Sequence, residues 1–71
     1  MERNAGAAFA RNLSYLRERK KISRRALSEL CGLSKNMVSI YESGRAEPRL
    51  SALSALADAL DVTTDKLLGR D

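Results

Sequence analysis

The chain has 71 residues, with 13 Lys or Arg against 9 Asp or Glu, and a net charge of +4. This length predicts one small domain over residues 1–71 with a single modest core. The absence of histidine excludes zinc sites built on histidine and Ser-His or Cys-His catalysis, and the single cysteine, Cys31, cannot form an internal disulfide.

No targeting or membrane segment is visible. The longest apolar run near the start, residues 7–10, is too short for a signal-peptide core or a membrane span. We therefore expect a cytoplasmic protein, which suits the free thiol of Cys31. Cys31 itself is expected to be a buried helix residue rather than a redox sensor.

Positive charge is concentrated toward the beginning of the chain. Residues 1–49 hold 11 basic and 5 acidic residues, a balance of +6, whereas residues 50–71 hold 2 basic and 4 acidic residues, a balance of −2. A basic run can be a solvated surface, or it can face a polyanion. Charge alone leaves both interpretations open.

Apolar residues recur at helical spacing from the start of the chain. Residues 5–20 are expected to form a first helix. Ser23 can cap a second helix that Gly32 ends, and Ser34 can cap a third that runs to about Ser43. The apolar side of the second helix is expected to comprise Ala26, Leu27, Leu30 and Cys31.

Two more helices are expected toward the end of the chain. Residues 50–60 form the fourth, with an apolar side of Leu50, Leu53, Leu56, Ala57 and Leu60. Thr63 caps a short fifth helix that Gly69 closes. No alternating strand pattern of useful length appears, so we predict an all-α bundle of five helices with its core within residues 9–69.

Residues 24–43 have the spacing of a DNA-binding helix-turn-helix. The small Ser28 lies four residues before Gly32, and the apolar Leu33, Val38 and Tyr41 follow. A small side chain lets two helix backbones approach, and a glycine permits the positive φ of a tight turn. Two helices crossing at a steep angle require this arrangement.

A helical wheel of the third helix separates two faces. One arc, facing the core, holds Met37, Val38, Tyr41 and Glu42; the other holds Lys35, Asn36, Ser39 and Ile40. Lysine and asparagine suit guanine and adenine edges in the major groove, and isoleucine suits a thymine methyl. An ordinary amphipathic helix shows a similar pattern, and an exposed Ile40 weighs only mildly against that interpretation.

The runs 27–34 and 38–45, with Pro48, resemble the Xre family of Cro and phage-repressor helix-turn-helix proteins. Residues 56–63 and 65–68 resemble the closing helices of that family. The resemblance implies a five-helix, lambda-repressor-like fold that binds operator DNA as a homodimer, with the third helix in the major groove. It implies a small transcriptional regulator, a repressor, associated with the nucleoid when bound to DNA.

The resemblance also implies roles for individual residues. Base contacts fall on Lys35, Asn36 and Ile40, with Ser39 adjacent, and phosphate contacts fall on Arg24, Ser43 and Arg45. Arg17 and Glu42 match an ion pair between the first and third helices, and the wheel separately places Glu42 on the core side. The dimer contact lies near the last two helices, where Val62, Leu67 and Leu68 supply apolar surface.

Two residues depart from the family pattern. Arg24 stands where glutamine usually braces the first recognition residue and meets a phosphate; arginine could reach the phosphate but cannot brace in the same way. Lys21 replaces a common turn glycine, so it is expected to hold a strained backbone.

Other functions are less well supported. The alternative is an antitoxin or adaptor, a protein-interaction module on the same fold that binds DNA only beside a partner. The basic residues lack the long amphipathic helix that membrane binding needs, and the few aromatic residues make a poor RNA-stacking platform. We expect no enzymatic activity, no cofactor, no metal and no small-molecule ligand.

Overall fold

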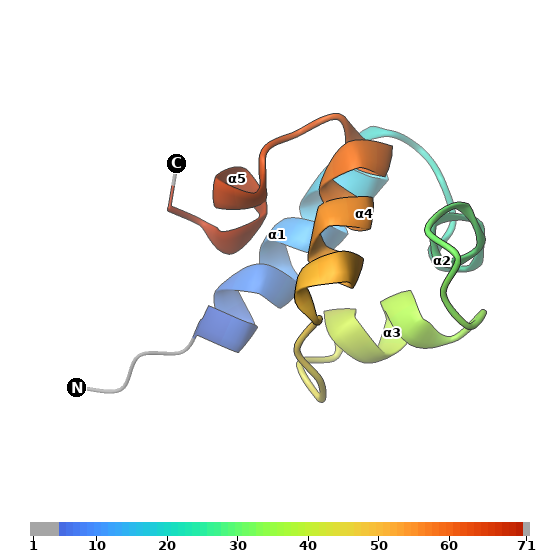
Figure 1. Cartoon of the computed structure of the whole chain (residues 1–71), viewed down its shortest axis with the longest axis horizontal. Coiled ribbons are helices and arrows are strands. Elements are labelled where there is room, and N and C mark those ends of the chain that lie inside the picture. Colours follow the sequence, from blue (N-terminus) through green and yellow to red (C-terminus); the bar gives the residue numbers. More distant parts are fainter. Residues whose placement is uncertain (1–4, 71) are drawn as a thin grey trace.

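The computed structural model of the protein describes residues 5–70, and residues 1–4 and 71 of the predicted domain lie outside this part (Figure 1). Five helices make up its regular structure. In chain order they are α1 (Ala5–Arg19), α2 (Arg24–Leu30), α3 (Met37–Glu42), α4 (Leu50–Leu60) and α5 (Thr64–Leu68). The predicted all-α, five-helix fold is therefore confirmed.

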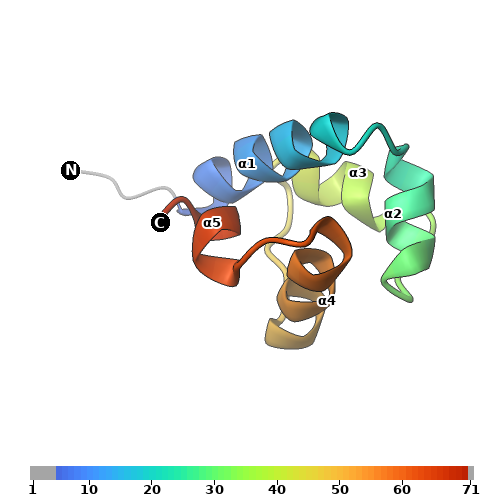
Figure 2. The same cartoon turned by 90° about the horizontal axis from the view of Figure 1, so that it is seen from above.

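The helices enclose one apolar core. Helix α1 packs against α3 and α5, while α2 packs against α3 and α4. Figure 2 shows α1 running along one side of the bundle, with α4 and α5 on the other. The rings of Phe9 and Tyr41 meet edge to face, with centroids 5.8 Å apart. The core cluster comprises Phe9, Leu13, Leu16, Leu27, Val38, Tyr41, Ala52, Leu53, Leu56, Ala57, Leu60 and Leu67.

Two predicted helix caps and one predicted strained turn are present in the structure. The hydroxyl of Ser23 accepts from the backbone N–H of Ala26 at 2.9 Å, and that of Thr63 accepts from Lys66 at 3.0 Å. Lys21 has a φ of +60°, which confirms the expected strain in the turn between α1 and α2. No helix within residues 5–70 combines the length and apolar character needed to cross a membrane.

Helix α3 begins later than predicted. The residue that caps it is Asn36 rather than Ser34, and the side chain of Asn36 makes no capping hydrogen bond. The backbone carbonyl of Ser34 accepts from the N–H of Met37 at 3.0 Å, which closes a turn before the helix. Lys35 and Asn36 therefore lie in this turn, just ahead of α3, rather than in its first helical turn.

Two leucines assigned to the core are exposed. Leu30 is 68% exposed and Leu50 is 84% exposed. The buried residues of α2 are Leu27 and Ser28, and Leu30 projects roughly 110° from the middle of that pair. Leu50 stands at the first position of α4, about 90° from the centre of its buried arc. Helical spacing alone did not reveal which side of each short helix meets the core.

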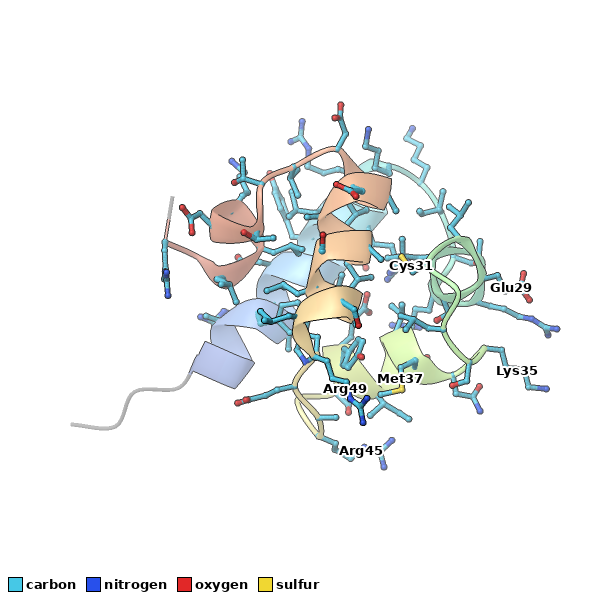
Figure 3. All side chains as sticks on the ribbon, viewed as in Figure 1. Glu29, Cys31, Lys35, Met37, Arg45 and Arg49 are labelled. Atoms are coloured by element: carbon cyan, nitrogen blue, oxygen red, sulfur yellow. The ribbon has the colours of Figure 1, made fainter. Side chains whose placement is uncertain are left out.

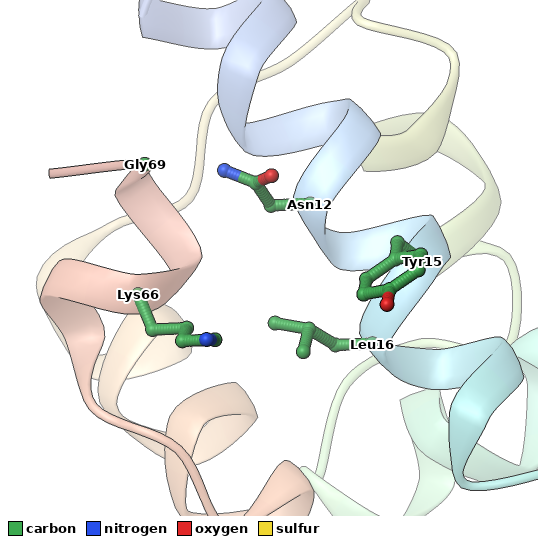
Figure 4. Close-up of a pocket in the computed structure, with 5 residues that line it drawn as sticks. All are labelled: Asn12, Tyr15, Leu16, Lys66 and Gly69. Carbon is green, nitrogen blue, oxygen red and sulfur yellow. The ribbon is translucent and has the colours of Figure 1, made fainter. Parts of the chain in front are cut away.

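A polar contact joins α5 to α1. The amide of Asn12 donates to the backbone carbonyl of Leu67 at 3.1 Å. Figure 4 shows Asn12 in the shallow hollow between these helices, which Tyr15, Leu16, Lys66 and Gly69 also line. Gly69 ends α5 with a φ of +78°, and a Cβ at this position would lie 3.0 Å from the Asn12 amide nitrogen. The positive φ favours glycine here, and a larger residue would also require the Asn12 amide to shift by a few tenths of an ångström.

Candidate nucleic-acid interface

Ser28 joins α2 to the following turn and to α3 through two hydrogen bonds. Its backbone carbonyl accepts from the N–H of Leu33 at 2.9 Å, just after Gly32, whose φ is +71°. Its hydroxyl accepts from the N–H of Val38 at 3.0 Å and is fully buried. The N–H of Val38 belongs to the first turn of α3, where backbone donors lack helical partners. Ser28 thus supplies an acceptor as well as the small size that the sequence indicated.

Of the predicted base-contact residues, Lys35 and Asn36 lie in the turn just ahead of α3, and Ser39 and Ile40 lie on α3 itself. Lys35, Asn36 and Ser39 are exposed, and Ile40 is half-buried. Figure 3 shows Lys35 before the start of α3 and Arg45 past its end, both extending away from the bundle. The side chains of Lys35 and Asn36 have no hydrogen-bond or ion-pair partner within residues 5–70. Their ammonium and amide groups are therefore available to an external ligand.

Glu42 joins two arginines at the end of α3. Its Oε2 lies 2.7 Å from Nε of Arg17, and its Oε1 lies 2.8 Å from Nε of Arg24. The side chains of Glu42 and Arg17 are 6% and 9% exposed, whereas that of Arg24 is 54% exposed. Arg17 also donates to the carbonyl of Ile22 at 2.8 Å. The ion pair between Arg17 and Glu42 is present, and Arg24 joins it from the surface.

Ser43 similarly holds Arg45. The Ser43 hydroxyl donates to the carbonyl of Ile40 at 2.6 Å and accepts from Nε of Arg45 at 3.1 Å. The single hydroxyl proton of Ser43 is therefore already used in the free protein. Ser43 is therefore placed to orient Arg45, and it has no free proton to donate to a phosphate.

A small hollow brings several of these groups together. It is lined by Ser14 of α1, Arg24 of α2, and Ser39, Glu42 and Ser43 from α3 and its end. Sequence reasoning did not single out Ser14, nor the pairing of Arg24 with Glu42. The sequence holds one signal for that pairing: Glu42 is an acidic residue on the core arc of α3, and residues 17–25 are strongly basic. Wheel positions within one helix do not say which neighbouring helix supplies the partner.

One predicted dimer residue is contradicted by its burial. Leu67 has no exposed surface and belongs to the core, so it cannot contact a second chain. Val62 and Leu68 are half-buried and pack against the core cluster. The apolar spacing of a five-residue helix does not separate a core leucine from a surface one.

Two ionisable groups near the core have altered pKa values. Burial raises the pKa of the Cys31 thiol above its ordinary value. Cys31 is half-buried just past the end of α2, rather than buried within the helix. Burial also raises the pKa of Tyr41, and the positive charge of Arg49 opposes this rise. Neither group is shifted toward reactivity.

Comparison with known sequences identifies the family. A family model described as helix-turn-helix matches residues 13–67. The chain is 44% identical over 59 residues to the HTH-type transcriptional regulator AnsR of Bacillus subtilis, covering 83% of this chain and 51% of that protein. It is 35% identical over 60 residues to an SPbeta prophage-derived HTH-type transcriptional regulator of the same organism, YonR, covering 84% and 56%. The chain thus spans about half the length of these relatives.

Solved structures agree in fold and in sequence. The hypothetical transcription factor NHTF from Neisseria matches with a TM-score of 0.84 and 35% identity, over 89% of this chain and 72% of that one. The restriction-modification controller protein C.AhdI from Aeromonas hydrophila matches with a TM-score of 0.82 and 32% identity, over 87% and 94%. These matches confirm the resemblance inferred from the sequence: the chain belongs to the helix-turn-helix family of DNA-binding transcriptional regulators.

Proposed function

We propose that this chain binds double-stranded DNA at a specific operator and acts as a repressor, with α3 in the major groove. The observation that carries the proposal is the arrangement around α3. The turn just ahead of it presents Lys35 and Asn36 without partners in the described chain, and Arg24 and Arg45 are each held through Nε nearby. Groups suited to base edges are thus flanked by cations suited to phosphates.

Each exposed group has a role that its chemistry supports. Asn36 can form paired hydrogen bonds with adenine, Lys35 can donate to guanine acceptors, and Ile40 can pack on a thymine methyl. Ser39 lines the hollow beside Arg24. Arg24 and Arg45 offer their Nη groups to backbone phosphates, and Ser43 orients Arg45.

We further propose that two copies bind one palindromic operator. A single short helix contacts few base pairs, and a dimer doubles the sequence that is read. Val62 and Leu68 remain the predicted contact residues near α4 and α5, since Leu67 is buried. We also propose that the protein acts in the cytoplasm, associated with the nucleoid when bound to DNA, and that it has no enzymatic activity.

The test is salt-dependent binding of the purified wild-type protein to a labelled random-sequence duplex. If a dimer neutralises about six phosphates, log K should fall with log salt concentration with a slope of about −5. A slope near zero between low and physiological salt would contradict DNA binding. This assay needs no knowledge of the operator, because phosphate contacts carry nonspecific binding.

The exposed leucines favour a second candidate function, the antitoxin or adaptor with a protein partner. Leu30 and Leu50 are 68% and 84% exposed, and exposed leucines can contribute to a protein interface. In that case the purified chain alone would bind duplex DNA weakly, and a partner would restore binding. The same salt titration therefore separates the two functions.

A further inference from the structure

We propose that Glu42 is a positioning residue for Arg24. It holds the Arg24 guanidinium through Nε, so that the Nη groups and the hydroxyls of Ser14 and Ser39 form a site for one phosphate of the DNA backbone. This inference rests on the proposed DNA-binding function. To the phosphate contact already proposed for Arg24 it adds a residue of α1 beside that contact and a buried acid that orients the cation.

The guanidinium of Arg24 is only partly engaged within the protein. Nε lies 2.8 Å from Oε1 of Glu42, while the side chain as a whole remains 54% exposed. A guanidinium carries five N–H donors, and only the one on Nε has a partner within residues 5–70. The four donors on the two Nη atoms are available to a ligand that approaches from solvent.

The local charge allows an anion to bind beside a carboxylate. Glu42 is shared by Arg17 and Arg24, so these three groups have a net charge of +1. Glu18 lies 3.6 Å from Nη2 of Arg17, but its side chain is 66% exposed and water screens its charge. Without Arg24, the buried pair of Arg17 and Glu42 would be neutral and would attract no phosphate.

Arginine can serve two anions at once, and lysine cannot. In arginine the Nε–H and the Nη–H groups point in different directions, so one carboxylate and one phosphate can each be bound. A lysine at position 24 has one ammonium, which Glu42 would attract away from DNA. Holding Arg24 in the free protein also lowers the side-chain entropy lost on binding.

Two hydroxyls complete the site. Ser14 and Ser39 line the same hollow as Arg24, and neither side chain has a hydrogen-bond partner within the described residues. Each can donate one hydrogen bond to a phosphate oxygen. Ser43 also lines the hollow, but its proton is donated to the carbonyl of Ile40. The cation and the free donors thus come from α1, α2 and α3.

The first test compares Arg24→Lys and Arg24→Ala with the wild type, on a labelled random-sequence 20-base-pair duplex across a potassium chloride series. Because lysine keeps the charge but cannot serve both anions, Arg24→Lys should lose about fivefold or more in affinity and about one unit of salt slope, as Arg24→Ala does. The matched control is Arg25→Lys, since Arg25 pairs with exposed Glu29 and should bind as the wild type does.

The second test asks whether Glu42→Gln raises or lowers the affinity for the duplex. Circular dichroism checks that the variant folds. This change raises the net charge from +4 to +5, so a purely electrostatic account predicts tighter binding. Our proposal predicts weaker binding, because Arg24 loses its orientation. Should Glu42→Gln fail to fold, the lysine comparison decides alone.

Two results would overturn the inference while leaving the proposed function intact. The first is a DNA affinity and a salt slope in Arg24→Lys equal to those of the wild type. The second is tighter DNA binding by folded Glu42→Gln. A wild-type protein that does not bind the duplex would instead overturn the proposed function, and this inference with it.

Discussion

Among single residues, Glu42 combines a nearly buried charge with two arginine partners. Its carboxylate is nearly buried, yet it faces one arginine inside the protein and another at the surface. A buried charge without a partner is costly, and removing one member of a buried pair destabilises a protein strongly. Glu42 therefore links the stability of the fold to the orientation of a surface cation.

We predict that Glu42→Ala lowers the free energy of unfolding by about 3 kcal/mol, because it leaves the buried Arg17 without its carboxylate. In a domain of this size that is a large fraction of the total stability. Arg24→Ala is the matched control, and it should cost at most about 1 kcal/mol since its side chain is 54% exposed. Urea unfolding followed by circular dichroism measures both, and equal losses would contradict a buried role for Glu42.

Individual residues also show where sequence reasoning stops. The resemblance led to the pair of Arg17 and Glu42, because both positions match a known pattern. The link from Arg24 to Glu42 departs from that pattern and depends on how α2 lies beside α3. Arg24 and Glu42 are 18 residues apart in sequence and lie on different helices, so only the folded arrangement brings them into contact.

Among the helices, α2 and α3 are joined by a junction that precedes the residues proposed to contact DNA. Ser28 accepts a hydrogen bond from the start of α3 and, through its carbonyl, another from the turn. These bonds join α2 to the following turn and to the first turn of α3. The residues proposed to read DNA thus follow a junction that is held by a buried side chain.

Ser28→Ala should cost about 1–3 kcal/mol, because it leaves the buried N–H of Val38 without an acceptor. The exposed Ser54 of α4 provides a control, and Ser54→Ala should change stability by less than about 0.5 kcal/mol. Thermal unfolding gives the two stabilities, and amide hydrogen exchange at Val38 reports the lost bond directly. Unchanged exchange at Val38 would show that the hydroxyl is dispensable.

The order of all five helices, and the approximate bounds of every helix but α3, could be predicted from apolar spacing, caps and glycines. The start of α3 could not, because a backbone turn over Ser34 to Met37 replaces the expected side-chain cap. The exposure of Leu30 and Leu50 was also missed. In helices of five to eleven residues, one or two apolar side chains can face solvent without breaking the pattern.

Across the whole molecule, basic and acidic residues divide between two regions of the chain. The basic residues collect in the part that contains α1 to α3, and residues 50–71 carry a net −2. An acidic region that includes Asp58, Asp61 and Asp65 is suited to a surface turned away from DNA, and all three are exposed. This polarity fits a protomer that meets DNA with one side and its partner with another.

We predict that two protomers bind a palindromic operator. Their recognition helices must lie about 34 Å apart to enter successive major grooves. The isolated protein can still be monomeric, because the half-buried surface at Val62 and Leu68 is small. Sedimentation of the protein with and without the operator measures the stoichiometry, and one protomer per operator at saturation would contradict the prediction.

The central claim is that residues at the start of α3 read bases while Arg45 anchors the backbone. The most direct measurement is the affinity of Asn36→Ala and Arg45→Ala for an operator selected from random duplexes and for its scrambled version. We predict that Asn36→Ala costs about 1–3 kcal/mol on the operator and little on scrambled DNA. Arg45→Ala should weaken binding to both DNAs similarly and reduce the salt slope by about one unit. If Asn36→Ala weakens both DNAs equally, or neither variant changes binding, α3 does not read the operator as proposed.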